Sequence, residues 1–365
     1  MRVVIAGGGT GGHLYPGIAL AETFKRFQAG SRILFIGTAH GMEATLLPEK
    51  GFSFEAISAK GLIGKAAGAR MKSILLAPVG LIQSLRILQR FAPNLVIGIG
   101  GYAAGPVLLA AVLLRMKRVI VEPNLVPGLA NKLIAPYVDL AVLAFEESRA
   151  SLRTKKIKVC GVPVRPEIAQ AAEAAASKGS DPKQRTLVIL GGSQGAHSIN
   201  RAMMEAIPTL EKEKNGLSVI HQTGKRDWEE VKAAYGRSAL SARVEPFIHG
   251  MAEVYAAADL VVSRAGAGTL SELAVAGKPS ILVPYPLATA HQEKNAAAFV
   301  SSGAAEMVLD RDLSGTPLGE RILALLSDSQ RLKEMGGAAK RRGHPQAAEE
   351  IVKACFELVK GRLKT

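Results

Sequence analysis

Residues 2–13 read RVVIAGGGTGGH, and residues 186–196 read TLVILGGSQGA. In each stretch a short apolar run leads into a glycine-rich turn, and a helical pattern follows. Glycine allows a sharp turn and a close approach of the backbone to a ligand, while the start of a helix offers unpaired N–H groups to an anion. Two such turns, about a domain length apart, predict two similar nucleotide-binding domains that face a shared cleft.

The length of the chain and the alternation of strand-like and helix-like runs agree with this prediction. A chain of 365 residues suits two α/β domains, because single cores rarely grow past roughly 250–300 residues. Strand-like and helix-like runs alternate, which predicts parallel sheets with right-handed crossovers. The predicted fold class is therefore α/β with two Rossmann-like domains, residues 1–164 plus a C-terminal helix 345–365, and residues 165–344. The predicted strands are 3–6, 32–37, 54–56, 95–98, 118–121, 140–143, 186–190, 218–222, 242–246, 260–263 and 280–283.

Positive charge is concentrated in the first half. The net charge is +15, and residues 1–164 hold 20 Lys and Arg against 8 Asp and Glu. No acid lies between Glu55 and Glu122, and apolar residues alternate with the bases there. This pattern suits an anionic membrane face, although a core helix with a basic outer face has the same pattern. Nucleic acid fits less well, because aromatic residues make up only 5%. The bases in this gap are Lys60, Lys65, Arg70, Lys72, Arg86, Arg90, Arg115, Lys117 and Arg118.

Three further features are expected to be structural. The apolar stretches 74–85 and 102–116 are interrupted or shorter than the ~20 residues that span a bilayer, so no membrane crossing is expected. Cys160 and Cys355 lack metal-ligand spacing, and we expect reduced, buried thiols. Asp310-Arg311-Asp312 matches the Asp-x-Asp metal pattern but is typical of a helix-capping loop, so no metal site is expected.

The first glycine turn places a histidine at a helix start. His13 follows Gly11-Gly12 directly, where the positive end of the helix dipole disfavours imidazolium and keeps the ring neutral, able to accept a proton. The alternative is a histidine that only closes the turn. A third glycine cluster, Gly100-Gly101-Tyr102, also follows a strand and offers a second phosphate site or a close-packed turn.

The second half holds further ligand-binding patterns. Residues 247–251 end a strand and open a helix, so backbone groups there could contact a base. Residues 263–272 predict a strand, a small-residue turn suited to a diphosphate, and a helix with Glu272 in its first turn. Glu272 could bind sugar hydroxyls or only complement the helix dipole. His291, Gln292 and Asn295 stand at another helix start, where hydroxyl-rich ligands are bound.

Taken together, these motifs resemble those of GT-B glycosyltransferases. More closely, the chain resembles the bacterial UDP-N-acetylglucosamine–N-acetylmuramyl-(pentapeptide) pyrophosphoryl-undecaprenol N-acetylglucosamine transferases of peptidoglycan synthesis. The resemblance covers nearly the whole chain. It rests on GGGTGGHLYP at 7–16, GGYAAGP at 100–106, Asn124 with GLANK at 128–132, GVPVR at 161–165, GGSQGA at 191–196, residues 264–272 and QEKNA at 292–296.

The resemblance implies an inverting, metal-independent transfer without a cofactor. N-acetylglucosamine (GlcNAc) would move from UDP-GlcNAc to the C4 hydroxyl of undecaprenyl-diphospho-MurNAc-pentapeptide, which converts lipid I into lipid II at the cytoplasmic face of the inner membrane. The first domain would hold the acceptor and the second the donor. Donor-binding positions carried over from the family are Thr10, Gly11, Gly12, Asn124, Arg165, Ser193, Ile248, Ala267, Gly268, Thr269, Leu270, Ser271, Glu272 and Gln292.

Several of these positions have roles implied by the family. The Ile248 backbone would contact uracil, Glu272 the ribose, and Gln292 the GlcNAc. On the acceptor side the family's groups map to His13, as catalytic base, and to Tyr102 with Gly100 and Gly101. Many relatives read His-Glu-Gln-Asn where this chain reads Val-Glu-Pro-Asn at 121–124, so no histidine stands at 121.

Three alternative functions use parts of the same pattern. A UDP-GlcNAc 2-epimerase shares the two-domain layout and the donor, and a lectin-like protein would bind UDP-GlcNAc without releasing UDP. An NAD-dependent oxidoreductase would need an acid roughly 20 residues after the glycine turn, at the end of the second strand. That strand ends at Gly37-Thr38, and the next acid is Glu43.

Overall fold

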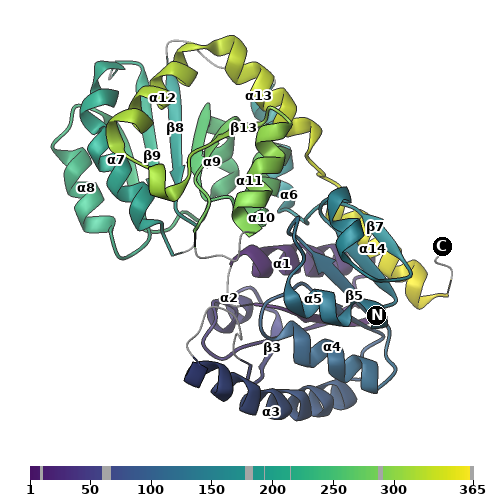
Figure 1. Cartoon of the computed structure of the whole chain (residues 1–365). Helices are drawn as coiled ribbons and strands as arrows, with labels where there is room; N and C mark the ends of the chain where they lie inside the picture. The colour runs from purple at the N-terminus through teal and green to yellow at the C-terminus, as the bar shows by residue number, and fades with distance from the viewer. Residues whose placement is uncertain are drawn as a thin grey trace. The chain divides into compact units, whose positions relative to one another are not determined.

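The computed structural model describes residues 1–8, 11–59, 67–176, 184–192, 194–213, 215–286 and 291–361, with backbone alone at 67–77, 175 and 176. The chain divides into two compact units (Figure 1). The first unit comprises Met1–Val164 and His344–Thr365, and the second comprises Arg165–Gly343. Each unit is an α/β domain around one parallel sheet, so the predicted fold class is confirmed.

The first unit has a seven-stranded parallel sheet in the order β3-β2-β1-β4-β5-β6-β7. Its interior strand β1 is a run of small and β-branched residues after Arg2, which suits a strand buried on both faces. The strands are β1 (Arg2–Ala6), β2 (Arg32–Gly37), β3 (Ser53–Ala56), β4 (Leu95–Gly98), β5 (Arg118–Glu122), β6 (Leu140–Leu143) and β7 (Ile157–Val159).

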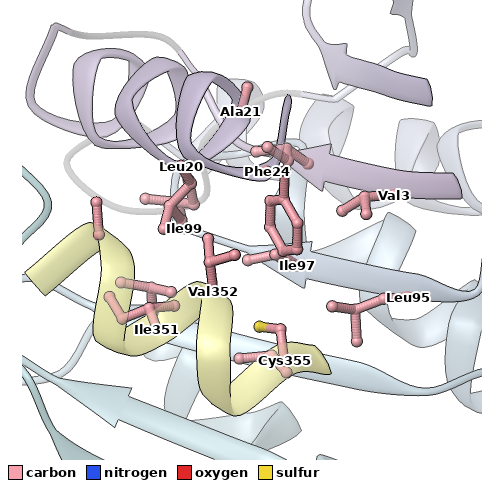
Figure 2. Packing of buried hydrophobic residues seen from close by; sticks show 14 of the residues in the cluster. Val3, Leu20, Ala21, Phe24, Leu95, Ile97, Ile99, Ile351, Val352 and Cys355 are labelled. Carbon is pink, nitrogen blue, oxygen red and sulfur yellow. The ribbon is translucent and has the colours of Figure 1, made fainter. Parts of the chain in front are cut away.

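Helices cover both faces of this sheet. Alternate residues of β1 point to opposite sides: Val3 and Ile5 pack in the cluster with α1 and α14, while Val4 and Ala6 pack in the cluster with α3 and α4. Figure 2 shows the first of these clusters, in which α14 at the end of the chain packs beside α1. The helices are α1 (Gly11–Phe27), α2 (Glu43–Glu49), α3 (Ala67–Phe91), α4 (Ala104–Leu113), α5 (Leu129–Ile134) and α14 (Ala347–Val359).

The second unit has a six-stranded parallel sheet in the order β10-β9-β8-β11-β12-β13. The strands are β8 (Arg185–Leu190), β9 (Leu217–Gln222), β10 (Ser241–Glu245), β11 (Leu260–Ser263), β12 (Ser280–Leu282) and β13 (Ala305–Met307). The helices are α6 (Pro166–Ala176), α7 (His197–Leu210), α8 (Trp228–Gly236), α9 (Met251–Ala257), α10 (Ala267–Ala276), α11 (His291–Ser301), α12 (Gly315–Ser327) and α13 (Ser329–Arg341).

The two segments that leave and rejoin the first unit lie side by side. Gly161 has φ +80°, and a β-carbon placed on it would lie 2.5 Å from Cβ of His344. Glycine is therefore required at position 161, where the two segments are in contact. The cysteines lie nearby in the core of this unit. Both are free and buried, and burial raises the pKa of the Cys160 thiol to about 12 and that of Cys355 further. Within the part of the chain described above, no helix combines the length and the apolarity needed to cross a bilayer.

Candidate functional site

In both units the glycine-rich turns lie where the strand order reverses. Neighbouring strands β1 and β4 lead off in opposite directions across the first sheet, and β8 and β11 do so in the second. In open parallel sheets, ligands bind outside the carboxyl ends of the strands at such a switch point. The turns after these four strands therefore mark one candidate site in each unit.

In the first unit, two glycine turns approach each other so closely that side chains are excluded. Gly100 has φ +107° and Gly101 has φ +80°. A β-carbon on Gly101 would lie 2.5 Å from the carbonyl oxygen of Gly8, and one on Gly7 would lie 3.2 Å from that of Gly100. The turn after β4 is therefore built against the turn after β1. Thr10, a predicted donor residue, lies outside the described residues.

His13 stands in the first turn of α1, which begins at Gly11, and its ring lies against the second glycine turn. The side chain is half-buried. Burial lowers the pKa of His13 below its ordinary value of 6.5, and the negative charge of Glu43 opposes this shift. The ring is therefore neutral at pH 7 and able to accept a proton. Tyr102, two residues after Gly100, is 55% exposed.

Glu43 is a residue of this site that sequence reasoning missed. Its side chain is wholly buried, and its Oε1 accepts hydrogen bonds from the backbone N (3.0 Å) and Oγ1 (2.9 Å) of Thr38. β-Carbons added at Gly8 or Gly41 would overlap its carboxylate, so both glycines leave room for it. The carboxylate of Glu43 therefore lies buried beneath the glycine turn and is not exposed to bind a ribose. This placement disfavours the dinucleotide alternative.

Glu122 organises the loop that contains Asn124. It is 1% exposed, and its carboxylate accepts hydrogen bonds from the backbone N (3.0 Å) and Nδ2 (3.1 Å) of Asn124, the backbone N of Gly128 (2.9 Å) and Nδ2 of Asn131 (2.8 Å). Asn124, a predicted donor residue, is therefore held by Glu122. Val121 is buried in the hydrophobic core, so position 121 offers no polar group to the site.

In the second unit, the glycine turn after β8 packs on the end of β9. The carbonyl oxygen of Gly192 accepts from Nε2 of Gln222 (2.8 Å) and from the backbone N of Gly195 (2.9 Å). Gly195 has φ +78°, and a β-carbon there would overlap the carbonyl oxygen of Thr223. Gly192 and Gly195 are therefore held in place before α7 begins. Ser193 lies outside the described residues.

A buried polar chain supports the same turn from the interior. Nδ2 of Asn200 donates to the carbonyl oxygen of Thr223 (2.9 Å) and to Oδ2 of Asp227 (2.7 Å), and Oδ1 of Asn200 lies 3.0 Å from Nε2 of His221. Burial lowers the pKa of His221 to about 3, so this histidine is neutral. Buried polar groups that satisfy one another in this way hold the backbone in one arrangement.

The small-residue turn after β11 leads into α10, which begins at Ala267. Glu272 is the sixth residue of α10 and lies in its second turn, so the prediction of an acid in the first turn is wrong. Its Oε1 accepts from Nη2 of Arg165 (2.9 Å), and its Oε2 accepts from the hydroxyl of Tyr255 (3.0 Å). Helix dipole effects fade beyond the first turn. The interpretation that Glu272 only complements the dipole of α10 is therefore no longer supported. Tyr255 was not predicted.

Asp310 is engaged in an ion pair with Arg264, which also donates to the carbonyl oxygens of Val283 (3.1 Å) and Pro284 (3.3 Å). The hydroxyl of Ser198 donates to Asp310 at 2.6 Å. These bonds tie the ends of β11 and β12 to the start of α7. Where side chains are described, no group of three or more His, Cys, Asp or Glu is arranged to hold a metal.

The remaining predicted positions flank these turns. Ile248 is 3% exposed and follows β10, and Gln292 stands in the first turn of α11, with its Oε1 accepting from the backbone N of Tyr285 (3.0 Å). The predicted residues thus fall into two groups. The first unit holds Gly11, Gly12, His13, Gly100, Gly101, Tyr102 and Asn124, and the second holds Arg165, Ile248, Ala267, Gly268, Thr269, Leu270, Ser271, Glu272 and Gln292.

Known protein families match both halves of the chain. Residues 3–142 match the glycosyltransferase family 28 N-terminal domain, and residues 186–351 match the glycosyltransferase family 28 C-terminal domain. A curated relative from Anaeromyxobacter sp. (strain Fw109-5) is 44% identical over 99% of this chain and 94% of its own length. It is named UDP-N-acetylglucosamine–N-acetylmuramyl-(pentapeptide) pyrophosphoryl-undecaprenol N-acetylglucosamine transferase.

Solved structures agree at the level of the whole fold. The crystal structure of MurG from Acinetobacter baumannii superposes with a TM-score of 0.77 at 28% identity and covers 99% of both chains. A UDP-GlcNAc 2-epimerase from Neisseria meningitidis, bound to UDP-GlcNAc, superposes with a TM-score of 0.68 at 14% identity, over 98% of this chain and 100% of its own. The likeness to the epimerase is one of fold alone.

Proposed function

The chain belongs to glycosyltransferase family 28 and, within it, to the UDP-N-acetylglucosamine–N-acetylmuramyl-(pentapeptide) pyrophosphoryl-undecaprenol N-acetylglucosamine transferases, and from this premise we propose its reaction and the roles of its residues. It transfers GlcNAc from UDP-GlcNAc to the C4 hydroxyl of undecaprenyl-diphospho-MurNAc-pentapeptide, with inversion at the anomeric carbon. Lipid I becomes lipid II, and UDP is released. Neither a metal nor another cofactor takes part.

The donor assignment depends on one observation: donor-type residues follow β10, β11 and β12 of the second sheet, and the helix after β11 begins at its switch point. The N–H groups at the start of α10, from Ala267 onward, suit the diphosphate. The carboxylate of Glu272 suits the ribose hydroxyls, the backbone at Ile248 suits the uracil edge, and Gln292 suits the GlcNAc. Arg165 carries a guanidinium with five N–H donors and stabilises the departing UDP together with α10.

His13 acts as the general base. Its neutral ring takes the proton from the C4 hydroxyl as this oxygen forms a bond to the anomeric carbon of GlcNAc, and the bond from that carbon to the UDP oxygen breaks. The negative charge leaves with UDP, and the proton stays on the imidazole. A base placed within hydrogen-bond reach typically contributes 10²–10⁴-fold to such a step.

The first unit holds the acceptor and contacts the membrane. Its glycine turns with Tyr102 receive the acceptor diphosphate. Large apolar side chains are exposed on α3, α4, α5 and the residues that follow. Arg86, Arg115 and Lys132, which belong to the same segments, are exposed as well. An apolar surface with basic neighbours suits the anionic cytoplasmic leaflet, where the protein is peripheral. The exposed apolar residues are Val79, Ile82, Leu109, Leu113, Leu129, Leu133 and Tyr137.

The reaction is tested by incubating the protein with UDP-GlcNAc, with and without the lipid-linked muramyl-pentapeptide, and measuring free UDP and the sugar products. A transferase releases UDP in step with consumption of the lipid. A 2-epimerase converts the donor without the lipid, and a lectin-like protein binds UDP-GlcNAc and releases no UDP. Either of the last two results would overturn the proposed reaction.

A further inference from the structure

Three segments of the second unit meet around the carboxylate of Glu272, and each contributes one member of a hydrogen-bonded group. Arg165 immediately precedes α6, Tyr255 lies on α9, and Glu272 lies on α10. Oε1 of Glu272 accepts from Arg165 at 2.9 Å, and Oε2 accepts from the Tyr255 hydroxyl at 3.0 Å. Each carboxylate oxygen therefore accepts from a different segment, Oε1 from the residue before α6 and Oε2 from α9.

Tyr255 is buried almost completely, with 1% of its surface exposed. Burial raises the pKa of the Tyr255 hydroxyl well above its ordinary value, and the negative charge of Glu272 raises it further. The hydroxyl therefore stays protonated at neutral pH and acts as a donor there. Glu272 itself is partly accessible, with 14% of its side chain exposed.

We propose that Tyr255 is a positioning residue for the sugar-nucleotide donor and that it makes the second unit selective for a ribose over a 2′-deoxyribose. A carboxylate offers about four lone-pair sites, of which Arg165 and Tyr255 use one on each oxygen. As far as the described residues are concerned, the two sites that remain are on different oxygens, an arrangement that accepts two vicinal hydroxyls at once. This inference rests on the proposed function, in which Glu272 receives the ribose.

Replacing Tyr255 with phenylalanine keeps the ring and removes only the hydroxyl. We expect Tyr255→Phe to raise the KM for UDP-GlcNAc about 5- to 20-fold, because a hydrogen bond to a charged group is lost and the carboxylate can rotate. The kcat at saturating donor should stay within about twofold, since Tyr255 touches no reacting atom. With the 2′-deoxyuridine analogue of the donor, the KM should change by less than about threefold, because that donor lacks one of the paired hydroxyls.

Tyr235→Phe is the matched control. Tyr235 lies in the same unit, is 4% exposed, and places its hydroxyl 3.4 Å from Nδ1 of His221. Its removal should lower the unfolding temperature to a similar degree and leave both KM values unchanged. If Tyr255→Phe raises the KM for both donors equally, or leaves both unchanged, the inference fails.

Glu272→Gln separates this inference from the proposed function. If Glu272→Gln leaves the KM for UDP-GlcNAc unaltered, the assignment of the ribose to Glu272 is wrong, and the inference falls with it. If Glu272→Gln raises that KM and Tyr255→Phe does not, the donor site stands and only the role of Tyr255 is wrong. Calorimetric binding of UDP to the same variants repeats both comparisons without the lipid acceptor.

Discussion

His13 and Gly100 are in such close contact that a β-carbon placed on Gly100 would lie 3.0 Å from Nε2 of His13. Gly100 also has φ +107°, which side-chain-bearing residues rarely adopt. The ring that we assign as the base is therefore bounded by a position where only glycine fits. In the proposed mechanism, the turn after β4 therefore leaves room for the imidazole.

Gly100→Ala should lower kcat at least tenfold, because the added methyl group displaces the imidazole. Gly51→Ala is the matched control, since Gly51 has φ +72° and nothing lies within 4 Å of an added β-carbon. It should cost about 1 kcal/mol of stability through backbone strain and leave kcat unchanged. Steady-state turnover and thermal unfolding of both variants test this, and equal turnover in the two would contradict it.

His13→Ala should reduce turnover by at least tenfold and up to about 10⁴-fold, because a general base is lost. The affinity for UDP-GlcNAc should stay nearly unchanged, since the donor is assigned to the second unit. Turnover is measured with the lipid acceptor, and affinity by calorimetry. His40→Ala, at an exposed histidine of the same unit, should behave as the wild type. Undiminished turnover in His13→Ala would exclude His13 as the base.

The pH dependence should follow His13. A base works when unprotonated, so kcat/KM should fall as pH decreases through the pKa of His13, which burial holds below 6.5. Glu43 raises this pKa by its negative charge, so Glu43→Gln should lower it and move the acidic limb to lower pH. The variant would then keep a larger share of its maximal rate at acidic pH. An acidic limb that stays in place or moves to higher pH would show that Glu43 does not act on the base.

Membrane binding should depend on the apolar face of α4 and α5. Leu113 and Leu133 are 58% and 67% exposed, and replacing both with serine should weaken binding to phosphatidylglycerol vesicles roughly tenfold, because apolar area is lost. Val300→Ser, at an exposed apolar residue of the second unit, is the control and should bind normally. Co-sedimentation measures this. If the double variant sediments as the wild type does, the membrane contacts a different surface.

Strands in the interior of both sheets were predictable because they are short apolar runs rich in β-branched residues, and β1, β2, β4 and β8 lead into glycine turns. The edge strands β7 (Ile157–Val159) and β13 (Ala305–Met307) were missed, since three residues carry too little pattern. The helical pattern of residues 318–335 predicts one helix, but the structure has two, α12 and α13, separated at Asp328. Asp328 accepts from the backbone N of Arg331 at 2.8 Å and caps α13, a signal that the sequence Ser-Asp-Ser contains.

Within the site, the residues that stand in the turns could be found from the sequence, and the residues that support them could not. Glu272 follows a recognisable turn, whereas its partner Tyr255 lies 17 residues away on another helix. From the sequence, Glu43 is only an acid that lies too far along the chain to bind the ribose of a dinucleotide. Its burial beneath Gly8 depends on how β2 and the following turn pack in three dimensions, and the spacing of a single sequence carries no information on such packing.

In the proposed function, the second unit binds the sugar nucleotide through α10 and its neighbouring turns. A crystal of the protein soaked with UDP-GlcNAc shows directly where the donor binds. We expect difference density for the ribose at Glu272, for the diphosphate at the start of α10, and for the base at Ile248. Density confined to the glycine turns around His13 in the first unit, with none at Glu272, would contradict the account.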